Sequence, residues 1–342
     1  MQTEYGVNDP SAQKLWSKKL EREALKATFI GGFMGEGTNA LIQIKPELKK
    51  NAGDKITTTL RMQLSGAGVM GDGTLEGNEE PLTTYTDNLF IDQLRHAVRS
   101  KGKMSEQRVP WSVRAEAKDG LTDWWAERFD TWFFNQVCGY TVQTDLRYTG
   151  LNAVTAPSTV IRPTGSTDQG LGSGNVFTLD LIDRAVAAAK KASPVVRPIK
   201  IKGKDHWPVV LHTDQVTSLR TNTASGQWLD IQKAAMAGGN IDGNPIATGM
   251  LGVYNGAMLY ESTRITNGVH SSTGAAVSTV RRAVLLGAQA AVLAFGQGYD
   301  STTSADWNEE LFDYGNQLGV EAGFIAGLKK TRYNGADLST IV

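Results

Sequence analysis

Four acidic side chains gather in one glycine-rich segment and are the group of residues best suited to bind a cation. Carboxylate oxygens are ligands that Ca²⁺ takes from proteins, but a calcium-binding loop places its ligands at fixed positions over twelve residues. That spacing is absent here, so we interpret the acids as a charged tip that meets basic residues of another molecule. The four acids are Asp72, Glu76, Glu79 and Glu80.

Two further groupings could carry chemistry, and neither completes a site. His212 and Asp214 could supply two metal ligands, but a zinc site needs three or four, and the other histidines lack a suitable spacing. The glycines between residues 31 and 37 loosely resemble a phosphate-binding loop, but they follow a predicted helix and lack the Gly-Lys-Ser/Thr ending. We therefore predict no metal, no cofactor and no phosphate site.

The sequence offers no nucleophile with a partner. Cys138 is the only cysteine, so no intrachain disulfide can form, and its place at the end of an aromatic helix predicts a small buried side chain. No Gly-x-Ser-x-Gly motif is present. We predict that the chain is not an enzyme and has no catalytic residues.

The composition is that of a soluble globular protein. Of 342 residues, 40% are hydrophobic and 20% are charged, and 35 basic residues balance 35 acidic ones. Proteins that grip nucleic acid usually carry a basic excess, so tight direct DNA binding is disfavoured. No apolar run reaches the ~20 residues that cross a bilayer, and the first residues lack a signal-peptide pattern, so we expect no membrane contact and a cytosolic product.

Two adjoining elements suggest how the chain acts. A polar strand begins at Ile56, and a loop with five glycines over residues 65–80 leads into a strand pair or a bent strand over 82–99. We expect little apolar content at the tip of this hairpin. A tryptophan-rich helix over 110–137, with Ser105 as the cap of its segment, would span roughly 40 Å. Neither element can bury itself within one monomer, which indicates a subunit that completes its core on a neighbour.

The rest of the chain is predicted to form a mixed α/β body. An amphipathic helix over 9–29 carries Trp16 on its apolar stripe. Residues 149–175 are expected to be an irregular connector, and the chain after residue 310 alternates glycine with strand-forming residues. The remaining predicted elements are helices over 179–192 and 228–236 and strands over 208–212, 251–261 and 282–295.

Several phrases of the sequence resemble the major capsid proteins of N4-like tailed bacteriophages, and the resemblance covers nearly the whole chain. The most specific phrase is RHAVRSKGKMSEQRVPWSVR, and the others include YGVNDPSAQKLWSKKLEREAL, WWAERFDTWFFNQ and FDYGNQLGVEAGFIAGLKKTRYNG. This resemblance implies an α+β Hong Kong 97-type capsid fold. Its expected parts are an N-terminal arm (1–50), an extended β-hairpin loop (51–103), a peripheral domain (104–173 and 268–342, with the spine helix at 110–137) and an axial domain (174–267).

The resemblance also implies a function. The chain would assemble into hexamers and pentamers of an icosahedral head shell that encloses phage double-stranded DNA without sequence-specific binding. Its partners would be other copies and, in addition, scaffolding, portal and cement proteins. It would be made in the host bacterial cytoplasm and end in the virion. The alternatives are another virion component, such as a cement or tail-tube protein, or a soluble oligomeric α/β enzyme.

We expect weak, noncovalent contacts between subunits. The acidic tip would meet basic residues such as Arg108, Arg114 or Lys118 of the next copy, with Arg61 and Trp16 as further contact candidates. Some capsids of this fold join a loop lysine to a neighbour's asparagine. No lysine lies between Ile56 and Ser100, so that bond is not expected. We also expect no N-terminal processing and an inner surface that is near neutral or acidic.

Overall fold

A 14-residue strand, β15 (Gln317–Lys330), organises the larger sheet. Antiparallel partners lie on both sides of it, namely β14 (Ala305–Phe312), β5 (Asp92–Arg99) and, at its end, β13 (Ala291–Phe295). Beyond β13, the parallel strands β2 (Ile42–Lys45) and β1 (Met34–Gly35) complete the sheet. The computed structural model describes residues 23–24, 28–47, 53–165, 167–222, 250–297 and 304–342. Trp16, the helix predicted over 228–236 and nearly all of the helix predicted over 9–29 lie outside these residues.

Glycine in β15 allows neighbouring backbone to come close. A Cβ atom at Gly327 would overlap the carbonyl oxygen of Phe90, so only glycine fits where the hairpin crosses this strand. This explains one of the glycines that alternate with strand-forming residues in this part of the sequence.

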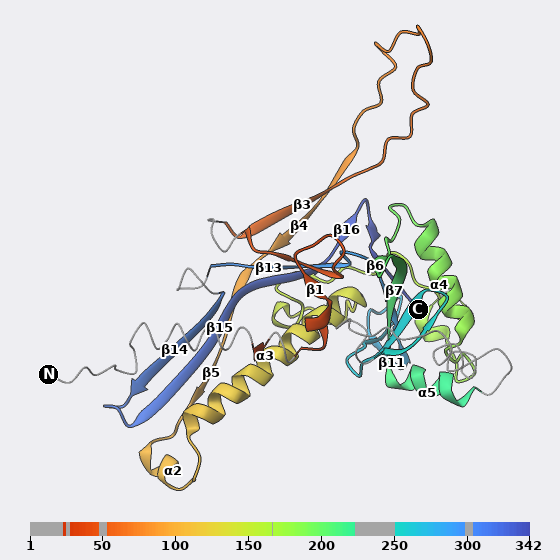
Figure 1. Cartoon of the computed structure of the whole chain (residues 1–342). Helices are drawn as coiled ribbons and strands as arrows, with labels where there is room; N and C mark the ends of the chain where they lie inside the picture. The colour runs from red at the N-terminus through yellow and green to blue at the C-terminus, as the bar shows by residue number, and fades with distance from the viewer. Residues whose placement is uncertain (1–22, 25–27, 48–52, 166, 223–249, 298–303) are drawn as a thin grey trace.

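The long helix α3 (Val113–Val137) lies along β15, as Figure 1 shows. Its inward-facing rings pack on the strand, with the Trp125 and Phe129 rings 4.6 and 5.5 Å from that of Phe324. The predicted helix is confirmed, although it begins three residues after Pro110 because Ser112 has extended backbone. The expectation that this helix cannot bury itself within one monomer is wrong, because Trp125, Phe129 and Trp132 are fully buried against other elements of the same chain. The prediction for Ser105 is wrong. It lies inside a short separate helix, α2 (Lys103–Gln107), which follows Gly102 in a conformation that favours glycine.

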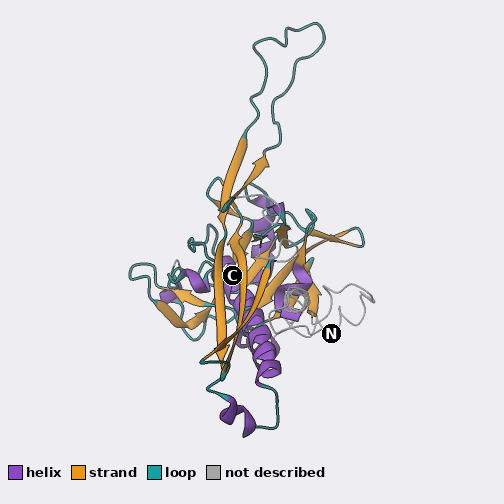
Figure 2. Cartoon of the chain, turned by 90° about the vertical axis from the view of Figure 1, so that its left-hand side faces the viewer, coloured by secondary structure: helices purple, strands orange, loops and turns teal. Residues whose placement is uncertain are grey.

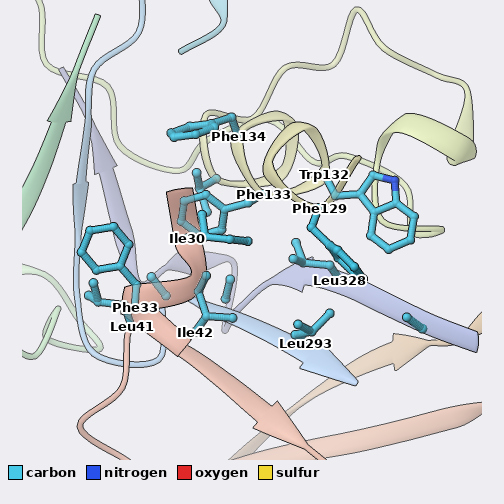
Figure 3. Close-up of a cluster of buried hydrophobic side chains, with 14 of the residues drawn as sticks. Ile30, Phe33, Leu41, Ile42, Phe129, Trp132, Phe133, Phe134, Leu293 and Leu328 are labelled. Atoms are coloured by element: carbon cyan, nitrogen blue, oxygen red, sulfur yellow. The ribbon is translucent and has the colours of Figure 1, made fainter. Parts of the chain in front are cut away.

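The main core lies where α3 meets the beginning of the described chain (Figure 3). The short 3₁₀ helix η1 (Phe29–Phe33) crosses α3, and Asp130 accepts hydrogen bonds from the backbone N–H groups of Phe29 and Ile30 at 3.0 and 3.2 Å. A buried carboxylate thus satisfies the open donors of a helix start. Burial raises the pKa of Asp130, although these hydrogen bonds oppose the shift.

The hairpin consists of β3 (Lys55–Arg61) and β4 (Thr84–Phe90), paired in register over all seven residues. Its base packs on the larger sheet, because Ile56 and Leu89 are buried with Val292 and Ala294. The predicted return segment is therefore a strand pair, since β4 stays with the hairpin and β5 joins β15.

The larger sheet and α3 form one body of the subunit, and a second sheet forms the other. Its order is β18 (Ser339–Ile341), β12 (Val284–Leu286), β7 (Lys204–Leu211), β9 (Ala257–Glu261) and β8 (Met250–Tyr254), and β6 (Ile199–Ile201) pairs with β7. Two helices accompany it, α4 (Leu179–Lys191) and α5 (Thr213–Thr221), and a separate apolar cluster joins the sheet to both. Smaller pairs are β10 (Asn267–Val269) with β11 (Ala276–Arg281) and β16 (Arg332–Tyr333) with β17 (Ala336–Asp337). The 3₁₀ turn η4 (Asp168–Gly170) lies in the predicted irregular connector, and η3 (Leu146–Tyr148) lies just before it.

Two predicted single strands are wrong because each is broken by a turn. Residues 251–261 form the hairpin β8–β9, whose turn at Asn255 and Gly256 has φ values of 46° and 76°. Residues 282–295 divide between β12 and β13, which belong to different sheets. The break includes Gln289, with φ at 60°.

Candidate assembly surfaces

A long loop over residues 62–83 extends from the hairpin away from the rest of the molecule (Figures 1 and 2). Every residue from Gln63 to Thr84 is exposed. The backbone N–H of Met62 donates to the carbonyl of Thr83 at 3.0 Å and closes the loop at its base. A segment this exposed adds nothing to the core of its own chain.

Two of the four loop acids shape the loop itself. The Glu80 carboxylate accepts hydrogen bonds from the backbone N–H groups of Ser65 and Gly66 at distances of 2.6–2.9 Å, and one from the Ser65 hydroxyl at 3.2 Å. These bonds hold the pKa of Glu80 below its ordinary value. Glu79 accepts from the N–H of Gly77 at 2.7 Å. Asp72 and Glu76 remain exposed at the tip.

The expectation of little apolar content at the tip is wrong. The Met70 side chain is 91% exposed, and four other apolar side chains of the loop are at least one-third exposed. Exposed apolar groups gathered on one segment typically mark a contact with another molecule. The five side chains are Leu64, Val69, Met70, Leu75 and Leu82.

Two of the basic candidates are engaged within their own chain. The Arg114 guanidinium lies 2.7 Å from the buried carboxylate of Glu309, which also accepts a hydrogen bond from the Trp307 indole N–H. Lys118 lies 2.7 Å from Glu23, and this partner raises the pKa of the Lys118 amine. Their predicted contacts with another subunit stay predictions, and the structure now gives both residues a role inside the subunit.

The other two basic candidates lie on the surface. Arg61 is the last residue of β3, at the base of the exposed loop, and Arg108 ends helix α2. The structure does not bring the exposed acids Asp72 and Glu76 near Arg108 within one chain, because the loop and α2 lie at opposite ends of the molecule (Figure 2).

Reasoning from the sequence missed an exposed apolar surface around α2. Met104 is 69% exposed and Trp111 is 57% exposed, and Leu311 and Tyr314 in the neighbouring β14–β15 turn region are also exposed. A signal was available, because Trp111 and Met104 lie in an otherwise polar segment where no apolar periodicity calls for them. We refer to residues 99–111 as the α2 corner.

A buried charge network ties α3 to the second body. Both Nε and Nη2 of Arg282 donate to one oxygen of Asp168, at 2.9 and 2.8 Å, and Arg162 donates to the other oxygen. The Arg282 side chain also donates to the carbonyls of Cys138 and Gly139 at the end of α3, where a positive charge is favoured. Burial alone would raise the pKa of Asp168, but the N–H of Val269 and the two arginines outweigh it and lower that pKa.

A second buried ion pair fixes the C-terminal strands. Lys330 and Asp337 are each 1% exposed and lie 2.8 Å apart, and Asp337 also accepts a hydrogen bond from the N–H of Ser158 at 2.9 Å. Burial lowers the pKa of the Lys330 amine, against the opposing effect of Asp337. Pairing of both charges offsets part of the cost of burying them.

The remaining groups considered for chemistry have local structural roles. His212 caps α5, because its Nδ1 accepts a hydrogen bond from the N–H of Asp214 at 3.1 Å. Burial raises the pKa of the Cys138 thiol. In the described part of the chain, no three His, Cys, Asp or Glu side chains are grouped as metal ligands would be. None of the described helices is both long and apolar enough to span a membrane.

Comparison with known proteins supplies a relationship for the whole chain. A family model described as "Phage capsid protein" matches residues 4–341. The major capsid protein of Pseudomonas phage KPP25 is 27% identical and aligns with 93% of this chain and 89% of its own length. The capsid of Ralstonia phage GP4 shares 32% identity at a TM-score of 0.78, with 100% of this chain and 98% of that chain covered. The capsid of cyanophage Pam1, 21% identical over 93% of this chain and 92% of its own, has the same fold at a TM-score of 0.68.

Proposed function

This chain belongs to the phage capsid protein family, and we propose that it is the major capsid protein that builds an icosahedral phage head. The observation that carries this conclusion is the end-to-end match in both sequence and fold to the capsid of Ralstonia phage GP4. The role is structural and not enzymatic. The exposed loop supports it, because a loop that adds nothing to its own core has a purpose in a multi-subunit shell.

The finer classification is also part of the proposal. The chain is an N4-like member with a Hong Kong 97-type fold. Residues 1–50 are its N-terminal arm, 51–103 its extended loop, 104–173 and 268–342 its peripheral domain, and 174–267 its axial domain. The protruding hairpin and the long helix α3 support this division. The strands β12 and β18 pair into the sheet of the axial segment, so the two domains share that sheet.

Assembly would proceed through noncovalent contacts. Copies form hexamers and pentamers, and the loop of each lies over the peripheral domain of the next. Scaffolding, portal and cement proteins are further partners. The shell encloses double-stranded DNA without reading its sequence, in line with the zero net charge of the chain. Its inner surface is near neutral or acidic. The protein is made in the host bacterial cytoplasm and resides in the virion.

Expression of the full chain, alone or with a scaffolding protein, tests this function by negative-stain electron microscopy. Closed particles of uniform size are the expected result. Tubes, decoration of a shell built by another protein, or small oligomers alone would contradict it. Tubes would indicate a tail-tube protein, and decoration would indicate a cement protein.

A further inference from the structure

Two segments at opposite ends of the subunit carry opposite charge. The loop over 62–83 has four acidic residues and no basic one, a net charge of −4. The α2 corner has four basic residues and only Glu106 as an acid, a net charge of +3. Figures 1 and 2 both place the loop and α2 at opposite ends, so one chain cannot bring them together. The basic residues of the corner are Arg99, Lys101, Lys103 and Arg108.

Both segments also expose large apolar side chains. In the loop, Met70 is 91% exposed and Leu75 is 61% exposed, while in the corner Met104 is 69% exposed and Trp111 is 57% exposed. Charged groups beside exposed apolar ones are what a protein–protein contact requires, because the apolar groups supply affinity and the charges select the partner.

The corner surface is already formed in the single subunit. Asn316 accepts a hydrogen bond from the N–H of Lys103 at 3.2 Å, and the Gln317 amide donates to the carbonyl of Lys101 at 3.2 Å. A cavity of about 200 Å³ opens there between α2 and the β14–β15 turn, lined in part by Lys103, Leu311 and Leu318. The corner therefore offers a fixed shape with an apolar recess rather than a disordered tail.

The loop is partly preorganised as well. Glu80 accepts hydrogen bonds from Ser65 and Gly66 across the loop, which limits the conformations of the segment that carries Met70 and Asp72. Restricting a segment before it binds lowers the entropy cost of binding.

We propose that the loop tip of one copy docks on the α2 corner of the next copy. Met70 and Leu75 lie against Met104 and Trp111, and the exposed acids of the tip face the basic residues of the corner. This proposal rests on the proposed function and names the surface that the loop contacts. Because the two surfaces differ and lie at opposite ends, the contact is head-to-tail, the type that closes into a ring when the rotation permits.

Acidic residues also lie near the corner. Glu310 and Asp313 are exposed nearby, but Asp313 accepts a hydrogen bond from the Asn316 side chain. Together with Glu106 they reduce the positive charge of the corner without reversing it. The docking surface therefore centres on Lys103 and Arg108, on the side of α2.

A cysteine pair tests the contact directly in assembled particles. The full chain carrying both Met70→Cys and Met104→Cys is assembled and then oxidised with copper phenanthroline and oxygen, which accept the two electrons lost when two thiols form a disulfide. Each copy carries one cysteine on the loop and one on the α2 corner, so it can be linked to two neighbours. A nonreducing gel should therefore show a ladder from dimers up to complete rings. A control pair, Met70→Cys with Val195→Cys, should give no ladder, because Val195 is exposed on the other body.

Exchange of charges provides an independent test. The double change Asp72→Lys and Glu76→Lys, and separately Lys103→Glu and Arg108→Glu, should each lower the yield of assembled particles by about tenfold or more. The chain with all four changes should recover most of that yield, since opposite charges again meet. Recovery is not expected if the two groups act at different interfaces.

The results distinguish failure of the docking proposal from failure of the proposed capsid function. If wild-type particles form but the Met70–Met104 pair gives no ladder and the four-change chain does not recover, the docking proposal is wrong and the capsid function stands. If the wild-type chain forms no closed particles, the proposed function fails and the docking proposal fails with it.

Discussion

Arg282 and Asp168 form a buried pair that connects the two bodies of the subunit. Two guanidinium nitrogens lie 2.9 and 2.8 Å from one oxygen of the Asp168 carboxylate, and a third donates to carbonyls at the end of α3. The pair joins residues 114 positions apart in the sequence, so it fixes the long helix relative to the β10–β11 strands and the 3₁₀ turn at 168–170.

Removal of Arg282 should destabilise the subunit strongly. Arg282→Ala leaves the buried Asp168 carboxylate with only Arg162 and the N–H of Val269 as partners. Breaking such a pair typically costs about 3–5 kcal/mol. Urea unfolding of the unassembled subunit, followed by tryptophan fluorescence, measures the loss. Arg184→Ala is the matched control, because Arg184 makes only an exposed contact with Asp180 at 3.9 Å and should cost less than about 1 kcal/mol. Equal losses in the two variants would contradict the assigned role of Arg282.

The same pair predicts how stability responds to acid. The pKa of Asp168 is lower in the folded subunit than the ordinary value of 3.8, so its contribution is present above that value. The contribution is lost as pH falls through the lower, folded-state pKa. The free energy of unfolding of the wild type should therefore fall more steeply below about pH 4 than that of Asp168→Asn. Parallel pH profiles for the two proteins would show that Asp168 does not titrate in this way.

Glu80 should control the order of the loop without affecting the stability of the fold. Glu80→Gln replaces an acceptor-only carboxylate with an amide that has one acceptor oxygen, so the N–H groups of Ser65 and Gly66 lose part of their bonding. Hydrogen exchange of these two amides should become faster, while the urea midpoint stays unchanged. The control Glu76→Gln should leave exchange at both amides as it is in the wild type. An unchanged exchange rate in Glu80→Gln would mean that the loop owes its shape to other contacts.

Substitution of two tryptophans should distinguish a residue required for folding, Trp125, from one required for assembly, Trp111. Trp125→Ala should cost about 3–5 kcal/mol, because its ring is fully buried between α3 and β15. Trp111→Ala should change the free energy of unfolding by less than about 0.5 kcal/mol, since its ring is exposed. It should nevertheless reduce particle yield, as measured by sedimentation. A large unfolding effect at Trp111 would place this residue in the core rather than on the contact surface.

Local patterns in the sequence were sufficient to predict the long helix and the hairpin. The apolar spacing from Ala117 to Val137 predicted α3, and the β-branched strand at Ile56 predicted the hairpin. The resemblance to capsid proteins supplied what these patterns could not, namely the fold type and the function. The Asn255-Gly256 turn could also have been predicted from the sequence, because this dipeptide is a strong hairpin signal. The break near Gln289 had no comparable signal.

Contacts between distant residues could not be predicted in the same way. Arg114 pairs with Glu309, 195 residues away, so an arginine expected at an interface serves its own subunit instead. The burial of a charge depends on the packing of elements that are remote in sequence, which composition and periodicity do not encode. The exposure of Met70 likewise became evident only once the hairpin and its loop were placed.

A cryo-electron microscopy map of the assembled particle shows directly where the loop over 62–83 lies. We predict a closed shell in which each loop crosses onto the adjacent subunit, with Met70 in density against Met104 and Trp111 of that copy. A shell in which the loops fold back on their own chains would contradict the loop contact, and particles that do not close would contradict the capsid function.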